Sequence, residues 1–238
     1  MRIWSCLFWG WVVEDADRNH HYRWSKKFGE YPAGDPELHH VVGSLYAEEH
    51  EAEEAERHLI LGTKDSPEVL SRMEYEWYKE DDSHTAPLYC ARAVLPYLLV
   101  ANVRAANASY RVFVSALAAD NKGLAVQDVG SQSSDVRIFP SLPLLNFLGL
   151  LLLAVQKGTP DLFRQLRSKY NPNISELGGL WDTPLEMIAE MYFGIQRPRQ
   201  SNPLFDMMGS LFGGGAPGGA PSRPAARRVE APAAEGLD

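Results

Sequence analysis

The sequence has few cysteines, no long basic run and no long apolar run. Among its 238 residues only Cys6 and Cys90 are cysteines, and no CxxC motif is present. Sparse cysteine excludes a disulfide framework and a cysteine-rich zinc site, and it fits a reducing compartment. The 23 Lys and Arg residues are outnumbered by 31 Asp and Glu, giving a net charge of −8. Because proteins that bind phosphate backbones normally carry a basic stripe, we expect no nucleic-acid partner.

Two apolar runs are poor candidates for membrane or export segments. The run over 144–155 has 12 residues, whereas a spanning helix needs roughly 20, so we expect a buried core helix. The run over 3–13 contains three Trp and is followed by Glu14, Asp15 and Asp17, without a small-x-small cleavage site. We therefore expect a cytosolic protein with no direct membrane insertion.

Apolar residues recur at helical spacing over most of the chain. In the first such segment the inward stripe is expected to consist of Leu38, Val41, Val42, Leu45 and Tyr46. Further helices are expected over 52–59, 69–77, 87–101, 103–117, 141–156, 161–170 and 181–195. Four helix starts pair a capping side chain with a proline, namely Asp35-Pro36, Ser66-Pro67, Thr159-Pro160 and Thr183-Pro184. The helix over 87–101 has Arg92 as its only charge, so we expect it between layers.

One stretch resembles a single tetratricopeptide repeat. Gly43, Tyr46, Ala55, Leu59 and Pro67 occupy characteristic positions of that pattern. The register does not continue into residues 70–103, which indicates a divergent stack of helical hairpins. The small residues would allow paired helices to approach closely.

The pattern changes to period two after residue 123. Val136 and Ile138 alternate with Arg137, and a polar loop over 130–134 separates this run from 124–129. The fold class predicted is therefore all-α: an α-solenoid of TPR-like antiparallel helical hairpins with one inserted β-hairpin at about 123–140. We divide the chain into an atypical Trp-rich segment (1–23), the solenoid (24–200), a short apolar motif (201–212) and a disordered Gly/Pro/Ala-rich tail (213–238).

The sequence offers little that could catalyse a reaction. No HExxH motif or nucleophile elbow occurs, and Cys90 is expected to be a buried hydrophobe. His50, Glu54 and His58 are spaced to share a helix face and could hold a divalent ion, although a solvated face is the simpler interpretation. We therefore expect no enzyme, no cofactor and no metal.

Two other segments keep alternatives open. The acidic run over 48–56 is either a solvated face or a docking site for a basic partner, and the helix over 141–156 either fills the core or forms a groove for a partner.

Several long segments resemble one known family. They are WSKKFGEYPAGDPELHHVVGSLYAEE, ERHLILGTKDSPEVLSRMEYEWYKEDD, HTAPLYCARAVLPYLLVANVRAAN, FPSLPLLNFLGLLLLAVQKG and MYFGIQRPRQSNPLFDMMGSLF. They are similar to the Golgi-to-ER traffic protein 4 family, in a form typical of filamentous fungi, from about Trp24 to Gly215. The resemblance implies a cytosolic, non-catalytic scaffold in the guided entry of tail-anchored proteins. Such a scaffold bridges the targeting ATPase to a ubiquitin-like adaptor that recruits chaperones.

The resemblance also implies where partners bind. In the family the N-terminal helices hold the ATPase, and the C-terminal half with its β-hairpin holds the adaptor's N-terminal segment. Carried onto this chain, the adaptor site covers 124–139 and 142–156. The expected contacts are Val126, Val136, Ile138, Phe139, Leu142, Leu145 and Phe147. Family members carry several more helices before the first shared motif, whereas 1–23 resembles none of them, so weak ATPase binding is expected.

Two alternative functions remain. A generic TPR-like peptide-binding co-chaperone would need a basic clamp for a peptide carboxylate, and no clustered Lys/Arg pair is evident on the helices before Lys122. A metal-dependent enzyme would use the face formed by His50, Glu54 and His58.

Overall fold

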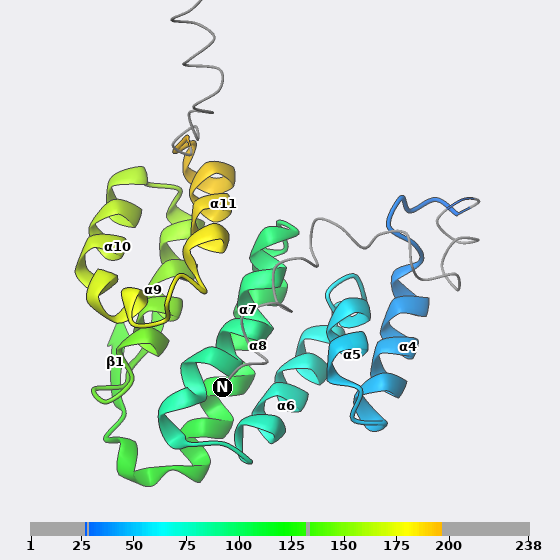
Figure 1. Ribbon diagram of the computed structural model, residues 1–238, viewed down its shortest axis with the longest axis horizontal. Helices are drawn as coiled ribbons and strands as arrows, with labels where there is room; N and C mark the ends of the chain where they lie inside the picture. The colour runs from blue at the N-terminus through cyan, green and yellow to red at the C-terminus, as the bar shows by residue number, and fades with distance from the viewer. Residues whose placement is uncertain (1–26, 28, 132–133, 197–238) are drawn as a thin grey trace, which may run out of the picture. The chain divides into compact units, whose positions relative to one another are not determined.

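The structure is a computed structural model that describes residues 27, 29–131 and 134–196. The predicted segments 1–23, 201–212 and 213–238 lie outside the described residues. Helices and strands carry the labels of Figure 1. The elements are α4 (Pro36–Glu48), α5 (Ala52–Leu59), α6 (Ser66–Tyr78), η1 (Ser83–Thr85), α7 (Ala86–Leu99), α8 (Val103–Asp120), η2 (Lys122–Leu124), β1 (Gln127–Ser131), β2 (Ser134–Ile138), α9 (Pro143–Lys157), α10 (Pro160–Ser175) and α11 (Asp182–Phe193).

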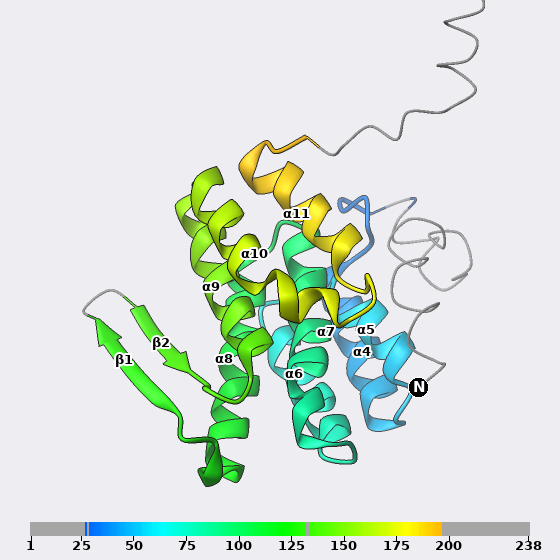
Figure 2. The same cartoon turned by 60° about the vertical axis from the view of Figure 1, so that its left-hand side comes forward.

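The predicted fold class is confirmed: the chain is an all-α solenoid with one inserted β-hairpin. Helices that follow one another along the chain pack side by side, α4 on α5, α6 on α7, α7 on α8, and α9 on α10 (Figures 1 and 2). The two strands pair antiparallel, with Gln127 opposite Ile138 and Asp128 opposite Arg137. The first strand begins three residues later than predicted, because residues 122–124 form a short 3-10 helix.

Helix α7 occupies the centre of the helical stack. It packs against α6, α8, α9 and α11, and all its residues except Leu88 and Arg92 are buried. The predicted position between layers is therefore confirmed. Two tyrosine hydroxyls fix this helix to its neighbours: Tyr97 donates to the carbonyl of Leu59 in α5 at 2.9 Å, and Tyr192 of α11 donates to that of Leu98 at 2.7 Å. Each such bond contributes about 1 kcal/mol.

Helix α4 is turned differently from the prediction. Leu38, Val41 and Leu45 are 40%, 54% and 55% exposed, whereas His39 and Gly43 are the buried residues of the helix. Gly43 sits in the contact with α5, where an added Cβ would lie 2.8 Å from the Leu59 Cγ. The inward stripe predicted for α4 is thus wrong for these three residues, because the close approach to α5 takes the face with the smallest side chain. Val42 and Tyr46 are half-buried.

At the four predicted helix starts, the prolines lie within the first three residues of the helix, but most of the expected side-chain caps are absent. Of the four predicted capping residues, Asp35 alone caps with its side chain, accepting the amide of Glu37 at 2.9 Å. Thr159 is the N-cap of α10 without a side-chain bond, and the N-cap of α6 is Asp65 rather than Ser66. Pro184 is the third residue of α11, so Thr183 does not cap it.

Candidate partner-binding site

The β-hairpin extends away from the helices and is anchored at the end of β2 (Figure 2). The Asn146 side chain of α9 holds both backbone groups of Phe139: the Phe139 amide donates to Asn146 Oδ1, and Asn146 Nδ2 donates to the Phe139 carbonyl, each at 2.8 Å. The Phe139 side chain is itself fully buried. Because two strands alone are marginally stable, this anchorage to α9 fixes the direction of the hairpin.

The predicted adaptor contacts divide into three groups. Ile138 is 36% exposed at the end of β2, and Val126 is half-buried beside α8. Val136 pairs with Val129 in the backbone ladder, and its side chain lies outside the described part of the structure.

The other four predicted contacts are buried. Phe139, Leu142, Leu145 and Phe147 are at most 5% exposed. Phe147 packs against Tyr170 and Trp181, with ring centroids 5.7 and 6.0 Å apart. The structure corrects the expectation for these four residues: they support the hairpin from the core and offer no exposed surface to a partner. Sequence reasoning missed Asn146, whose role is set by a contact seven residues away in the chain.

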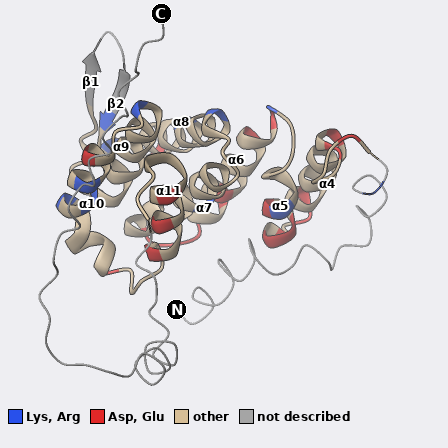
Figure 3. Cartoon of the chain, turned by 90° about the horizontal axis from the view of Figure 1, so that it is seen from above, with Lys and Arg blue, Asp and Glu red and all other residues tan. Residues whose placement is uncertain are grey.

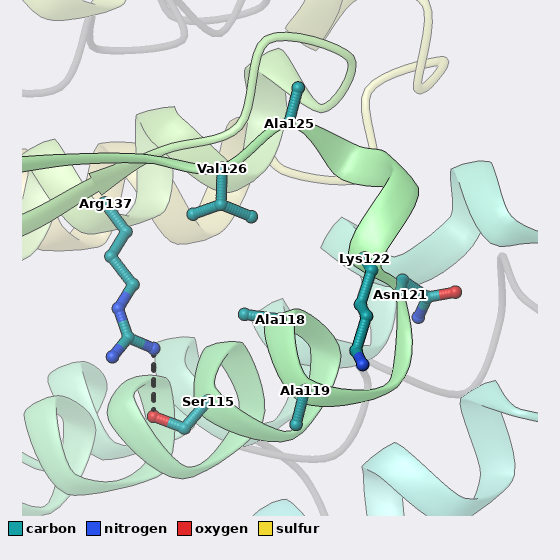
Figure 4. A pocket seen from close by; sticks show the side chains of 8 residues that line it. All are labelled: Ser115, Ala118, Ala119, Asn121, Lys122, Ala125, Val126 and Arg137. Atoms are coloured by element: carbon teal, nitrogen blue, oxygen red, sulfur yellow. Dashed lines mark hydrogen bonds between the residues drawn. The ribbon is translucent and has the colours of Figure 1, made fainter.

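A hollow of about 540 Å³ lies between α8 and the chain entering and leaving the hairpin (Figure 4). We call it the α8 hollow; it is lined by Ser115, Ala118, Ala119, Asn121, Lys122, Ala125, Val126 and Arg137. In Figure 4 Val126 and Arg137 point from the hairpin side toward α8. The Arg137 guanidinium donates to the Ser115 hydroxyl at 3.2 Å. The lining therefore combines small apolar side chains with the polar Ser115 and Asn121 and with two cationic side chains.

The backbone at the edge of the hollow adopts an uncommon conformation. Ala125 has φ 45° and ψ 46°, the left-handed helical region. A residue with a Cβ loses roughly 1–2 kcal/mol there relative to right-handed geometry. This turn separates η2 from β1 and sends the chain back across α8, so it shapes the hollow.

Two histidines form a buried pair where α4 meets α5. The Nδ1 atoms of His39 and His58 are 3.0 Å apart, so one nitrogen donates and the other accepts. Tyr46 stacks on His58 with centroids 5.7 Å apart. Burial, followed by the nearby His39 and Arg57, lowers the pKa of His58 to about 4, and burial also lowers the pKa of His39. The pair is therefore neutral near pH 7.

The metal site considered at His50, Glu54 and His58 is not formed. His50 lies outside α5 with φ 62°, so it does not share a helix face with Glu54 and His58. Within the described residues no group of three His, Cys, Asp or Glu side chains is placed to hold a metal ion.

A charged cluster joins α5, α6 and α7. Arg92 pairs with Glu56 and with Glu74, whose carboxylate is 3.3 Å from the Arg92 Nε. The Arg92 guanidinium also lies 4.8 Å from the centre of the Trp77 ring. Glu74 is fully buried, and its burial, followed by the charge of Glu56, raises its pKa well above the usual range. We call this the Arg92 cluster; its geometry is that of a structural link between helices.

The remaining sequence candidates offer no catalytic chemistry in the described residues. Cys90 is fully buried, and that burial raises the pKa of its thiol well above the usual range. In the acidic run, Arg57 pairs with Glu53 and Glu54 at 3.1 and 3.0 Å. No helix in the part of the chain that the structure describes has the length and apolar character to cross a membrane.

Comparison with known proteins gives one consistent result. The family model described as "GET4: Golgi to ER traffic protein 4" matches residues 18–212. The Golgi to ER traffic protein 4 of Aspergillus fumigatus is 55% identical over 216 residues, covering 89% of this chain and 62% of that relative. That of Schizosaccharomyces pombe is 32% identical, covering 80% of this chain and 61% of that relative.

A solved structure agrees with these relatives. The "Crystal structure of C. therm. Get4" superposes with a TM-score of 0.74 at 73% identity. The match covers 89% of this chain and 64% of that one. The chain thus spans a little under two thirds of the length of the proteins that it matches.

Proposed function

Because this chain belongs to the Golgi to ER traffic protein 4 family, we propose that it is a non-catalytic cytosolic scaffold in the targeting of tail-anchored proteins to the endoplasmic reticulum. In this proposal it bridges the targeting ATPase to a ubiquitin-like adaptor. Family membership supports a role in the GET pathway. The relatives are named as traffic proteins, which agrees with a binding function rather than a catalytic one.

The observation that carries the adaptor site is the anchored hairpin. It extends beyond the helices, presents Ile138 at its base, and is held by Phe139 and Asn146 (Figure 2). A rigid, projecting element with an exposed β-branched side chain can bind a partner without a large ordering cost. We therefore place the adaptor contact at Ile138 and Val126, with Val136 retained as a prediction from the sequence.

The buried residues have an indirect part in this proposal. Phe139, Leu142, Leu145 and Phe147 would hold the hairpin in its position rather than contact the adaptor.

The test is binding of the adaptor's N-terminal segment to the full chain. We expect the two to co-elute from a size-exclusion column. Ile138→Asp should weaken binding at least tenfold, about 1.4 kcal/mol, because a carboxylate would be desolvated in an apolar contact. Val41→Asp, at an exposed β-branched position on α4 outside the proposed site, is the control and should bind like the parent chain.

Separate elution of the parent chain and the segment would contradict the adaptor proposal. Equal binding by the parent and Ile138→Asp chains would remove Ile138 from the interface.

A further inference from the structure

Basic residues gather on the face of α8 that leads to the α8 hollow. Arg104 and Arg111 are seven residues apart on this helix, and Lys122 follows its end. We call these three the basic stripe. All three are exposed. The spacing from Arg104 to Arg111 is two helical turns, so the two side chains lie on one face, and Ser115 of the hollow follows one turn later.

The basic stripe has no acidic partner among the described side chains. Other exposed cations do have one, for example Arg72 with Glu68 and Lys79 with Glu76. Asp120, the sole acidic residue of α8, accepts a hydrogen bond from the Tyr75 hydroxyl at 2.8 Å. Arg137 adds a fourth cation at the hollow; it bonds to Ser115 and faces Asp128 in the strand register.

Local helix electrostatics explain only part of this arrangement. Lys122 follows the C-terminus of α8, where the helix dipole favours a cation. Arg104 lies in the first turn of the same helix, where the dipole disfavours a cation, and Arg111 lies in its middle. Arg104 and Arg111 therefore gain no stabilisation from the helix dipole or from an acidic partner among the described side chains.

We propose that the basic stripe and the α8 hollow bind an acidic polypeptide segment. Its carboxylates would pair with Arg111 and Lys122, and its small apolar side chains would contact Ala118 on α8 and Val126 on the facing hairpin side (Figure 4). Charge complementarity selects this occupant, and the hollow of about 540 Å³ accommodates side chains rather than a helix. The assignment of that segment to the adaptor rests on the proposed function.

The experiment measures binding of two probes to the full chain at 50 and 500 mM NaCl. One probe is the adaptor's N-terminal segment. The other is a 12-residue peptide of alternating Glu and Ala, which does not depend on the adaptor proposal. The double variant Arg111→Gln/Lys122→Gln is compared with Arg164→Gln/Lys169→Gln on α10, which removes the same charge from exposed positions.

At 50 mM NaCl we expect the Arg111→Gln/Lys122→Gln variant to bind both probes at least tenfold more weakly than the parent chain. The α10 variant should bind within twofold of the parent. At 500 mM NaCl the difference should shrink to about twofold, because salt screens exposed charges.

The outcomes separate this inference from the proposed function. If the parent and the Arg111→Gln/Lys122→Gln variant bind the adaptor segment equally at 50 mM NaCl and neither binds the Glu/Ala peptide, the inference is overturned while the adaptor proposal stands. If the parent binds only the Glu/Ala peptide, the adaptor proposal fails and the acidic-segment site stands. Tighter binding of a 12-nucleotide single-stranded RNA than of either probe would also overturn the inference.

Discussion

The two regions on either side of residue 82 build their helix contacts from different chemistry. Residues 30–82 contain sixteen Asp and Glu against four Lys and Arg, whereas 83–196 contain eight against nine. In Figure 3 many of the acidic residues, coloured red, lie on and beside α4 and α5. Contacts made by the first region include buried polar groups: the His39–His58 pair lies within it, and the Arg92 cluster joins its Glu56 and Glu74 to Arg92 at the start of the second region. Contacts in the second region, such as α9 on α10, are formed by apolar side chains.

This difference affects how strongly the contacts in each region select one arrangement of its helices. A buried charge or a neutral imidazole needs one particular partner, so polar contacts permit few alternative arrangements of α4, α5 and α6. Apolar contacts depend on volume and shape, and they tolerate a similar side chain better than a missing one. The second region carries the hairpin, and its uniform core gives that element a firm base.

The largest expected effect comes from breaking the Arg92 cluster. Arg92→Met should lower the free energy of unfolding by about 3–5 kcal/mol, because it leaves Glu56 and Glu74 buried without their cation. The triple variant Arg92→Met/Glu56→Leu/Glu74→Leu should recover most of this loss, since no buried charge remains. Urea unfolding followed by tryptophan fluorescence measures both.

An apolar contact supplies the comparison. Leu148→Ala, at a fully buried site in α9, should cost about 2–5 kcal/mol through lost burial and a cavity. If the triple variant is as unstable as Arg92→Met alone, the contrast between the two regions is wrong.

The second prediction compares a close helix approach from each region. Gly43→Ala should destabilise by about 1–3 kcal/mol, because its Cβ would meet the fully buried Leu59 at 2.8 Å. Gly149→Ala in α9 should cost less, since its nearest neighbour at 2.5 Å is the hydroxyl of Tyr110, which is only half-buried. Without these contacts, an alanine in a helix would gain roughly 1 kcal/mol over glycine.

Two controls are available for the glycine variants. Gly123→Ala meets no atom within 4 Å and should change stability by less than about 0.5 kcal/mol. Gly149→Ala/Tyr110→Phe should recover part of the loss, because the clashing hydroxyl is gone. Equal stability of the Gly43→Ala chain and the parent in urea unfolding would show that α4 and α5 are not held this closely.

The sequence predicted the helices well because their apolar spacing is a local property. The burial of α7 followed from its lack of charge, and the hairpin followed from the alternation around Arg137. The rotation of α4 was not predictable from spacing, since Leu38 and Val41 look like core residues until the contact of Gly43 with Leu59 is known.

The position of the candidate site stays a prediction, and the structure shows which of its expected residues are buried. The resemblance pointed to the hairpin and α9, but alternation did not reveal that Leu145 and Phe147 face the core. The Asn146 bonds, and the link between Arg92 and two glutamates 18 and 36 residues away, depend on tertiary structure. For the basic stripe, the seven-residue spacing of Arg104 and Arg111 already indicates in the sequence that the two side chains share one helix face.

The smallest expected effect is a pH response confined to the first region. The unfolded His58 has a pKa near 6.5 and the folded residue one of about 4, so the unfolded chain binds the extra proton. The contribution of neutral His58 to the free energy of unfolding is therefore fully present above about pH 7, and it is lost as the pH falls from 6.5 toward 4. Between pH 7 and pH 5 the loss should be about 1–2 kcal/mol. The second region contains one histidine, His84, which is exposed.

Hydrogen exchange locates this response, after correction for the intrinsic pH dependence of exchange. Amide protection over 36–59 should fall about tenfold relative to that over 143–157 between pH 7 and pH 5. In His58→Gln the relative fall should shrink, whereas His84→Gln should behave like the parent. Equal loss of protection in both regions would show that the response comes from carboxylates throughout the chain. Retention of the relative fall in His58→Gln would remove the histidine pair as its cause, leaving the contrast between the regions to rest on the Arg92 cluster alone.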